Sequence, residues 1–214
     1  KITVSKPMQV DKGEKISKTT ARMNLEVEKM IRSSPEDWFW LHDRWKVPKT
    51  KFLTYYHKRS YCIPSEFDRK TLKKFKIILL APNTEEKCKL SMGAIKKIAE
   101  GRPDAEITIL CNSDFSPLWN LQENHFQIIE KGLLGWNKDL SEKITNSVFD
   151  AAVLFQKSKK DAKKIKQCGI PHIAGCSSNK CNKFLDHLIQ NDHIEGSSDY
   201  YLKIAESIGA EKTV

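Results

Sequence analysis

The sequence predicts an α/β protein with a doubly wound parallel sheet, preceded by a mostly helical segment. Two observations carry this prediction. Beyond residue 75, short apolar runs alternate with stretches of helical length and pattern, as in repeated strand–helix–strand units. The first of these runs, at 76–82, is continuously apolar after Lys76, which is typical of a strand that is buried on both faces.

The first third of the chain is expected to be largely helical. A short β-type run at 2–4 comes first, and Thr19 or Thr20 then caps a helix. The apolar residues of that helix repeat at helical spacing, namely Met23, Val27, Met30 and Ile31. A second helix is expected at Ser34, because Pro35 and two acidic residues follow that N-cap candidate.

The α/β part is expected to begin at Lys76 and to follow a regular order. We expect a polar loop at 83–88 after the first strand, and then a helix that carries Leu90 and Ile98. The further strands are predicted at 106–111, 125–129, 149–155 and 170–174, and the further helices around 117–119, 139–147 and 159–167. Residues 48–75 show no clean period and contain prolines and many basic residues, so they are interpreted as a basic linker. The predicted domains are therefore 1–47 and 76–214.

The charge of the chain is concentrated in its first third. The net charge is +10, and residues 1–75 hold 18 basic and 9 acidic residues against 19 and 18 in the remainder. Such asymmetry points to an anionic partner, either lipid headgroups or nucleic acid, and a solvated basic surface is the equally weighted alternative. No apolar run reaches the roughly 18 residues of a membrane span. The polar first twenty residues contain no visible signal peptide, and the initial Lys1 suggests a piece of a longer protein.

The six cysteines form no Cys-x-x-Cys pair, and free buried thiols are the favoured interpretation. A zinc site of Cys168, Cys176 and Cys181 with His172 or His187 is the alternative. Its spacing matches no common zinc module, so we predict no metal and no cofactor. A dinucleotide-binding loop is also rejected, because no Gly-x-Gly-x-x-Gly follows the first strand.

A tryptophan-rich segment carries the first family resemblance. Residues 33–46 read SSPEDWFWLHDRWK and hold three of the five tryptophans. With the preceding Ile31-Arg32, this segment resembles the C-terminal end of the lipid A biosynthesis acyltransferases. The resemblance implies work on lipid at the inner face of the bacterial inner membrane, with Trp40, Arg44 and Lys46 as membrane contacts. For Trp38 and Trp45, which share a helix face with Leu41, core packing is the favoured alternative.

The catalytic His-x-x-x-x-Asp pair of that family lies far upstream of its tryptophan-rich end and is absent here. A literal match, from His187 to Asp192, lies in the wrong domain and is expected by chance. We therefore expect no acyl transfer by these residues.

The second resemblance covers about residues 75–214. The stretches AEITILCNSDFSPLWN and FDAAVLFQKSKKDAKKIKQCGIPHIAG, followed by His193, Tyr201-Leu202 and Ile208-Gly209, are similar to the N-terminal half of glycosyltransferase family 9, the lipopolysaccharide heptosyltransferases. This resemblance implies a Rossmann-like half of a GT-B fold. It also implies a lipid A or lipopolysaccharide-core acceptor, and a nucleotide-sugar donor that is held mostly by a second half.

The loop after the first strand departs from the family pattern. The family carries Gly-Asp there, with the Asp as presumed general base, whereas Glu86-Lys87 occupies that position here. Lysine is a poor base at neutral pH, so Glu85 or Glu86 is the candidate base and an ordinary solvated loop is the alternative. Asn83, Thr84 and Lys87 are the candidate acceptor-binding residues, in a cleft at the carboxyl ends of the strands.

Three functional hypotheses follow. The first is a piece of a bifunctional envelope-lipid enzyme, bound peripherally to the inner membrane and inactive as this isolated chain. The second is a non-catalytic glycolipid-binding or docking module, which the departure at Lys87 favours. The third, nucleic-acid binding, is supported by charge alone, so we predict no nucleic-acid partner.

Overall fold

The computed structural model describes residues 6–37, 74–102, 105–120, 126–132 and 135–210. The chain divides into two compact units. The described residues 6–37 belong to the first unit, and those from Lys74 onward belong to the second. The predicted strand at 2–4, the linker at 48–73 and the tryptophan-rich segment from Trp38 onward lie outside the described residues.

The described part of the first unit is dominated by the helix α1, Ile16–Ser33, which buries none of its residues. It starts earlier than the expected Thr19 or Thr20, because the chain turns at Gly13 and is extended at Lys15. Thr20 therefore lies inside the helix, where its hydroxyl donates to the carbonyl of Ile16. At the expected second start, Pro35–Asp37 form the 3₁₀ turn η1, and the residues that follow lie outside the described part of the chain.

The second unit is built on a six-stranded sheet that is parallel throughout, in the order β3-β2-β1-β4-β5-β6. The strands are β1 (Phe75–Leu80), β2 (Ala105–Asn112), β3 (Gln127–Lys131), β4 (Ala151–Leu154), β5 (His172–Cys176) and β6 (His187–Ile189). The expected doubly wound α/β fold is thus confirmed. The three-residue β6 was not expected from the sequence.

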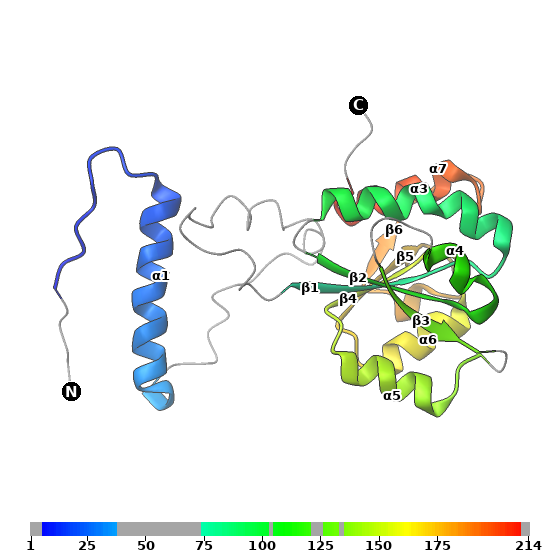
Figure 1. The fold of residues 1–214 in the computed structure, drawn as a ribbon, viewed down its shortest axis with the longest axis horizontal. Helices are drawn as coiled ribbons and strands as arrows, with labels where there is room; N and C mark the ends of the chain where they lie inside the picture. The colour runs from blue at the N-terminus through cyan, green and yellow to red at the C-terminus, as the bar shows by residue number, and fades with distance from the viewer. Residues whose placement is uncertain (1–5, 38–73, 103–104, 121–125, 133–134, 211–214) are drawn as a thin grey trace. The chain divides into compact units, whose positions relative to one another are not determined.

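Helices cover both faces of this sheet (Figure 1). They are α3 (Glu85–Gly101), α4 (Ser116–Asn120), α5 (Lys138–Ser147), α6 (Lys159–Gln167) and α7 (Ser198–Ser207), with 3₁₀ turns η4 (Ser113–Phe115) and η5 (Asn182–Phe184). Helices α3 and α7 lie side by side on one face, and α5 and α6 lie on the other.

The continuous apolar run of β1 supplies both halves of the core. Ile77 and Leu79 belong to the apolar cluster on the α3/α7 face, whereas Ile78 and Leu80 belong to the cluster on the α5/α6 face. Successive side chains of a strand point to opposite faces, so a strand between two helical layers needs apolar residues at every position. This arrangement explains the run that predicted the strand.

Side-chain caps set the starts of three helices. Asn137, Ser158 and Ser197 each accept a hydrogen bond from a backbone N–H in the first turn of α5, α6 and α7, respectively. Several expected bounds need correction. The strands expected at 149–155 and 170–174 are observed as Ala151–Leu154 and His172–Cys176. The expected loop at 83–88 ends at Thr84, because α3 begins at Glu85. The expected strand at 125–129 begins only at Gln127 and extends to Lys131.

A buried arginine joins the ends of the two helices on the α3/α7 face. Arg102, which follows α3 and is 2% exposed, donates from Nη1 to the carbonyl of Ile208 at 3.0 Å. Its guanidinium also lies 5.0 Å from the centre of the Phe75 ring. A buried charge needs such partners, so Arg102 fixes the end of α3 against the end of α7.

Candidate functional site

The candidate site lies where the loops after β1 and β4 meet. In the strand order, β1 connects outward to β2 and β4 connects outward to β5, so the topology switches direction between these neighbours. Ligands of open α/β sheets bind beyond the carboxyl ends of the strands at such a point. Here the backbone N–H of Asn83, after β1, donates to Oε1 of Gln156, after β4, at 3.2 Å. The two loops are therefore tied together by one side-chain amide.

On the α5/α6 side of this point, a buried carboxylate collects three polar partners. Asp161, in the first turn of α6, accepts a hydrogen bond from Nε1 of Trp136 at 2.5 Å and one from Nε2 of Gln156 at 3.4 Å. Nζ of Lys131, at the end of β3, lies 3.6 Å from Oδ1 of Asp161. The same ammonium donates to Oδ1 of Asn83 at 3.4 Å.

The burial of this group indicates its role. The side chains of Asp161 and Lys131 are 7% and 14% exposed, respectively. A buried carboxylate must be paired and hydrogen-bonded, and the partners of Asp161 meet that need. Asp161 therefore orients the Lys131 ammonium and the Trp136 indole.

On the α3/α7 side, a second lysine–carboxylate pair is more open. Oε1 of Glu195, in the loop between β6 and α7, accepts the backbone N–H of Lys157 at 3.1 Å. The Lys157 ammonium lies 3.8 Å from Oε2 of Glu195, and the two side chains are 31% and 40% exposed. The ammonium also lies 5.9 Å from the centre of the Tyr200 ring. This pair presents both a cation and a carboxylate to solvent.

The acidic base candidates lie on a helix and not in the expected loop. Glu85 and Glu86 occupy the first turn of α3, where a negative charge is favourable, and both are exposed. Oε1 of Glu85 lies 2.6 Å from the ammonium of Lys89, one turn along the helix. Thr84 is the N-cap residue of α3, although its side chain makes no capping hydrogen bond.

Lys87 occupies the position at which the glycosyltransferase family carries its aspartate. Its side chain contacts the loop between β6 and α7, near the carboxyl-terminal end of the unit. A methyl group added at Gly196 would lie 2.9 Å from Cε of Lys87 and 3.5 Å from its Cδ. Gly196 also has a φ of +96°, which favours glycine. The aliphatic stem of Lys87 thus packs on the Gly196 backbone, beside Glu195.

Six residues of this edge were not identified from the sequence: Lys131, Trp136, Gln156, Lys157, Asp161 and Glu195. Gln156 follows a strand within two residues, and Lys131 ends one. A search for polar residues just after each predicted strand would have found both of them. Asp161 and Glu195 carry no such signal, because their roles depend on contacts with residues far away in the sequence.

The membrane-contact candidates Trp40, Arg44 and Lys46 lie outside the described residues, so their role stays a prediction. Among the helices that the structure describes, none is long and apolar enough to cross a bilayer.

The cysteines of the alternative zinc site do not all converge, whereas its two histidines lie side by side, with Nδ1 of His172 3.2 Å from Nε2 of His187. Cys168 belongs to the core cluster on the α5/α6 face and Cys176 to the cluster on the α3/α7 face, so the sheet separates them. The described residues contain no group of three or more metal-ligating side chains. Burial raises the pKa of the Cys88 thiol to about 11 and that of Cys111 to about 12, which keeps both thiols protonated at neutral pH. Buried, protonated thiols of this kind are typical of cysteines that pack in a core.

Comparison with known proteins supports both resemblances. Residues 1–47 match the model of the bacterial lipid A biosynthesis acyltransferase family. No curated protein matches the chain in sequence.

Solved structures of similar fold include three glycosyltransferases. E. coli ADP-heptose lps heptosyltransferase II is 19% identical, with a TM-score of 0.52 over 61% of this chain and 40% of that one. E. coli heptosyltransferase WaaC with ADP is 14% identical, with a TM-score of 0.55 over 64% and 48%. A glycosyl transferase of family 9 from Veillonella parvula is 12% identical, with a TM-score of 0.50 over 64% and 42%.

The chain therefore spans less than half of the length of these three structures. At these identities the likeness concerns the fold. The chain joins a segment that matches the lipid A biosynthesis acyltransferase family to an α/β unit with the fold of lipopolysaccharide heptosyltransferases.

Proposed function

We propose that the α/β unit is the acceptor-side half of a heptosyltransferase-like enzyme that acts on lipid A or on the lipopolysaccharide core. The observation that carries the proposal is the presence, in one chain, of a segment from a lipid A-directed family and a unit with a heptosyltransferase fold. Two segments related to the same envelope lipid favour a shared substrate over an unrelated use of a common fold.

The carboxyl edge of the sheet has suitable chemistry for an anionic glycolipid acceptor. The ammonium groups of Lys131 and Lys157 flank the tied loops of Asn83 and Gln156, and Lys87 adds a third cation on the α3/α7 side. Lysines bind phosphates as point charges, and amide side chains bind sugar hydroxyls. In this proposal Asn83, Thr84 and Lys87 contact the acceptor, and Asp161 keeps Lys131 in position.

Glu86 is the better of the two base candidates. Glu85 is engaged with Lys89, whereas Glu86 has no ion-pair partner among the described residues. A general base must be unprotonated and free to approach the attacking hydroxyl. The nucleotide-sugar donor would be held by a second half, so we expect no transfer by the 214 residues alone.

The first unit would bring this half to the inner face of the bacterial inner membrane. The net positive charge of the first third, with Trp40, Arg44 and Lys46, fits an anionic lipid surface. Vesicles of anionic lipid should bind the chain, and binding should weaken with rising salt as the Debye length falls to about 8 Å and below. Equal binding to neutral vesicles would contradict this role, and salt-sensitive binding to DNA without lipid binding would favour the nucleic-acid hypothesis.

A non-catalytic glycolipid-binding module is the second candidate function. It is favoured by Lys87, which occupies the expected position of the base and is packed against Gly196. Such a module would retain acceptor binding and lack any contribution to transfer.

The decisive experiment mixes the chain with the carboxyl-terminal half of a heptosyltransferase, its nucleotide-sugar donor and a lipopolysaccharide-core acceptor. The enzyme hypothesis expects transfer that is lost in Glu86→Gln and retained in the matched variant Glu106→Gln, a partly exposed acidic position near the start of β2. Calorimetric binding of the acceptor with background transfer throughout would instead support the binding module. Absence of acceptor binding by the chain would contradict both.

A further inference from the structure

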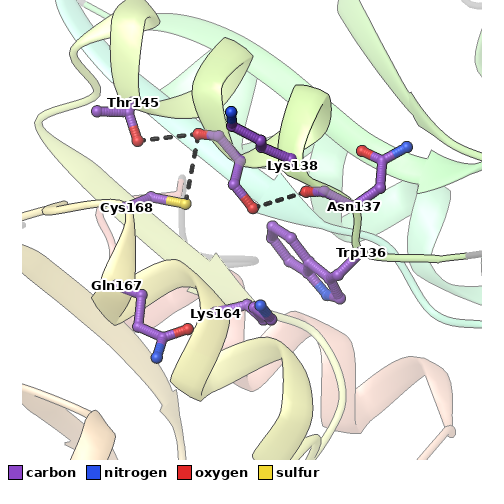
Figure 2. Close-up of a pocket in the computed structure, with 8 residues that line it drawn as sticks. Trp136, Asn137, Lys138, Thr145, Lys164, Gln167 and Cys168 are labelled. Atoms are coloured by element: carbon purple, nitrogen blue, oxygen red, sulfur yellow. Dashed lines mark hydrogen bonds between the residues drawn. The ribbon is translucent and has the colours of Figure 1, made fainter.

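A cavity lies between α5 and α6, with a volume of about 460 Å³. Figure 2 shows residues that line it: Trp136, Lys138 and Thr145 belong to α5 and the loop before that helix, whereas Lys164 and Gln167 belong to α6. This volume is in the range of pockets that hold small ligands. The function proposed above leaves the cavity unused.

The cavity is positively charged. Its lining includes two lysines and no carboxylate. Lys138 lies 3.6 Å from Glu142, in a pair whose side chains are both largely exposed, and Lys164 has no ion pair among the described residues. Burial raises the pKa of the Cys168 thiol at the wall of the cavity, and the Thr145 side chain and the Lys164 ammonium oppose that rise. Because Lys164 lines the cavity and has no ion pair among the described residues, its charge suits an anionic group of a ligand.

Hydrogen-bonding groups with spare capacity accompany the lysines. The hydroxyl of Ser141 donates to the carbonyl of Asn137, and that of Thr145 donates to the carbonyl of Ser141, each at 2.9 Å (the second bond is among those drawn in Figure 2). Both hydroxyl oxygens thus remain available as acceptors. The amide of Gln167 has no hydrogen-bond partner in the described part of the chain and is exposed. The cavity can therefore accept and donate several bonds to a ligand that is rich in hydroxyl groups.

Trp136 provides an apolar platform at one end. Its indole N–H is committed to Asp161 at 2.5 Å, which fixes the orientation of the ring. The face of an indole is electron-rich, and the C–H bonds on one side of a pyranose ring carry partial positive charge, so the two surfaces attract each other. An oriented aromatic face beside hydroxyl acceptors and a cation matches the surface of an acidic sugar.

We propose that the cavity between α5 and α6 is a binding site for an anionic saccharide. The sugar ring packs on Trp136, its hydroxyl groups bond to Ser141, Thr145 and Gln167, and its phosphate or carboxylate pairs with Lys164. The cavity lining does not include the loops after β1 and β4, and Trp136, whose N–H bonds to Asp161, is the residue that it shares with the candidate site described above.

The test is a titration of the ¹⁵N-labelled 214-residue chain with glucose 6-phosphate, with glucose, inorganic phosphate and AMP as separate arms. We expect a Kd on the order of 1 mM for glucose 6-phosphate in this cavity. We expect glucose 6-phosphate to shift the amide signals of α5 and α6 and the indole N–H of Trp136. We expect the binding to be weaker for phosphate and for glucose.

Two lysines on the same helix provide a matched pair of variants. Lys164→Gln should weaken the binding of glucose 6-phosphate about fivefold or more, because it removes a charge-assisted bond. Lys163→Gln removes the same charge from an exposed residue outside the cavity lining and should leave the Kd within about twofold. Gln167→Ala, at an exposed position, is a second test that leaves the charge unchanged and should also weaken binding.

Several results would overturn the proposal. One is the absence of saturable shifts, and another is the confinement of the shifts to the loops around Asn83 and Gln156. Equal weakening by both lysine variants would show general attraction of anions. Phosphate binding as tight as that of the sugar phosphate would remove the saccharide from the inference, and tighter binding of AMP would assign the cavity to a nucleotide.

Discussion

The two sides of the carboxyl edge hold the same kind of ion pair in different surroundings. On the α5/α6 side, the carboxylate of Asp161 is nearly buried and receives bonds from Trp136 and Gln156 besides its lysine. On the α3/α7 side, Glu195 and Lys157 are about one third exposed and lie 3.8 Å apart. The same pairing chemistry therefore stabilises the fold on one side and leaves groups available to a ligand on the other.

The largest expected effect comes from breaking the buried side. Asp161→Ala leaves the Lys131 ammonium and the Trp136 N–H without their carboxylate, in a place where water replaces it poorly. We expect a loss of about 3 kcal/mol in the free energy of unfolding, measured by urea denaturation. Asp161→Asn keeps one acceptor for Trp136 and should lose less. Wild-type stability in Asp161→Ala would show that the pair contributes nothing to the fold.

A second effect concerns the contact that shapes the open side. Gly196→Ala places a methyl group 2.9 Å from Cε of Lys87 and puts alanine at a φ of +96°. We expect a destabilisation of about 1–2 kcal/mol, measured in the same denaturation experiment. In a Lys87→Ala background the steric part disappears and the backbone part remains, so the cost should be smaller. An equal cost in both backgrounds would show that Lys87 does not press on Gly196.

A third effect concerns the buried thiols in the apolar core on the α3/α7 face. The folded pKa values of Cys88 and Cys111, both on the α3/α7 face, are raised from 9.0 to about 11 and about 12 by burial. Above pH 9 the unfolded thiols lose their protons while the folded ones keep them, so the contribution to stability is full below pH 9 and falls as the pH rises toward 11–12.

Each such thiol should lower the free energy of unfolding by about 1 kcal/mol per pH unit in that window. Denaturation curves between about pH 8 and 10.5, a range that brackets the unfolded pKa, measure this slope. In Cys111→Val the slope should become shallower, because one titrating group is gone. An unchanged slope in the variant would show that the loss at high pH comes from other groups, such as the lysines.

The sheet could be predicted from the sequence because its signal is local. The apolar run of Ile77 to Leu80 identifies β1 by itself, and the charged helix at 159–167 coincides with α6 because Ser158 caps it. The three-residue β6 was missed because its segment, from His187 to Ile189, is too short to show a period.

Most of the candidate site could not be predicted, for a different physical reason. Lys131 and Asp161 are thirty positions apart in the sequence numbering, and they meet only because β3 and α6 are placed by the strand order. Neither the residue types nor their spacing in the sequence predicts such a pair. The loop after β1 was found because a family resemblance pointed to it, although its acidic residues belong to α3. Local patterns give elements, whereas contacts between elements decide which polar residues form a site.

The smallest expected effect is the counterpart of the first, on the open pair. Glu195→Gln keeps an oxygen that accepts the backbone N–H of Lys157 and removes only a loose, partly exposed ion pair. We therefore expect a change below about 0.5 kcal/mol in the free energy of unfolding, under the conditions used for Asp161→Asn. Both variants should also be measured at low and high salt, because salt screens the exposed ion pair much more than the buried one. If Glu195→Gln cost as much as Asp161→Asn and were insensitive to salt, both sides of the edge would be equally fixed. That result would argue against the α3/α7 side as the side that contacts the acceptor.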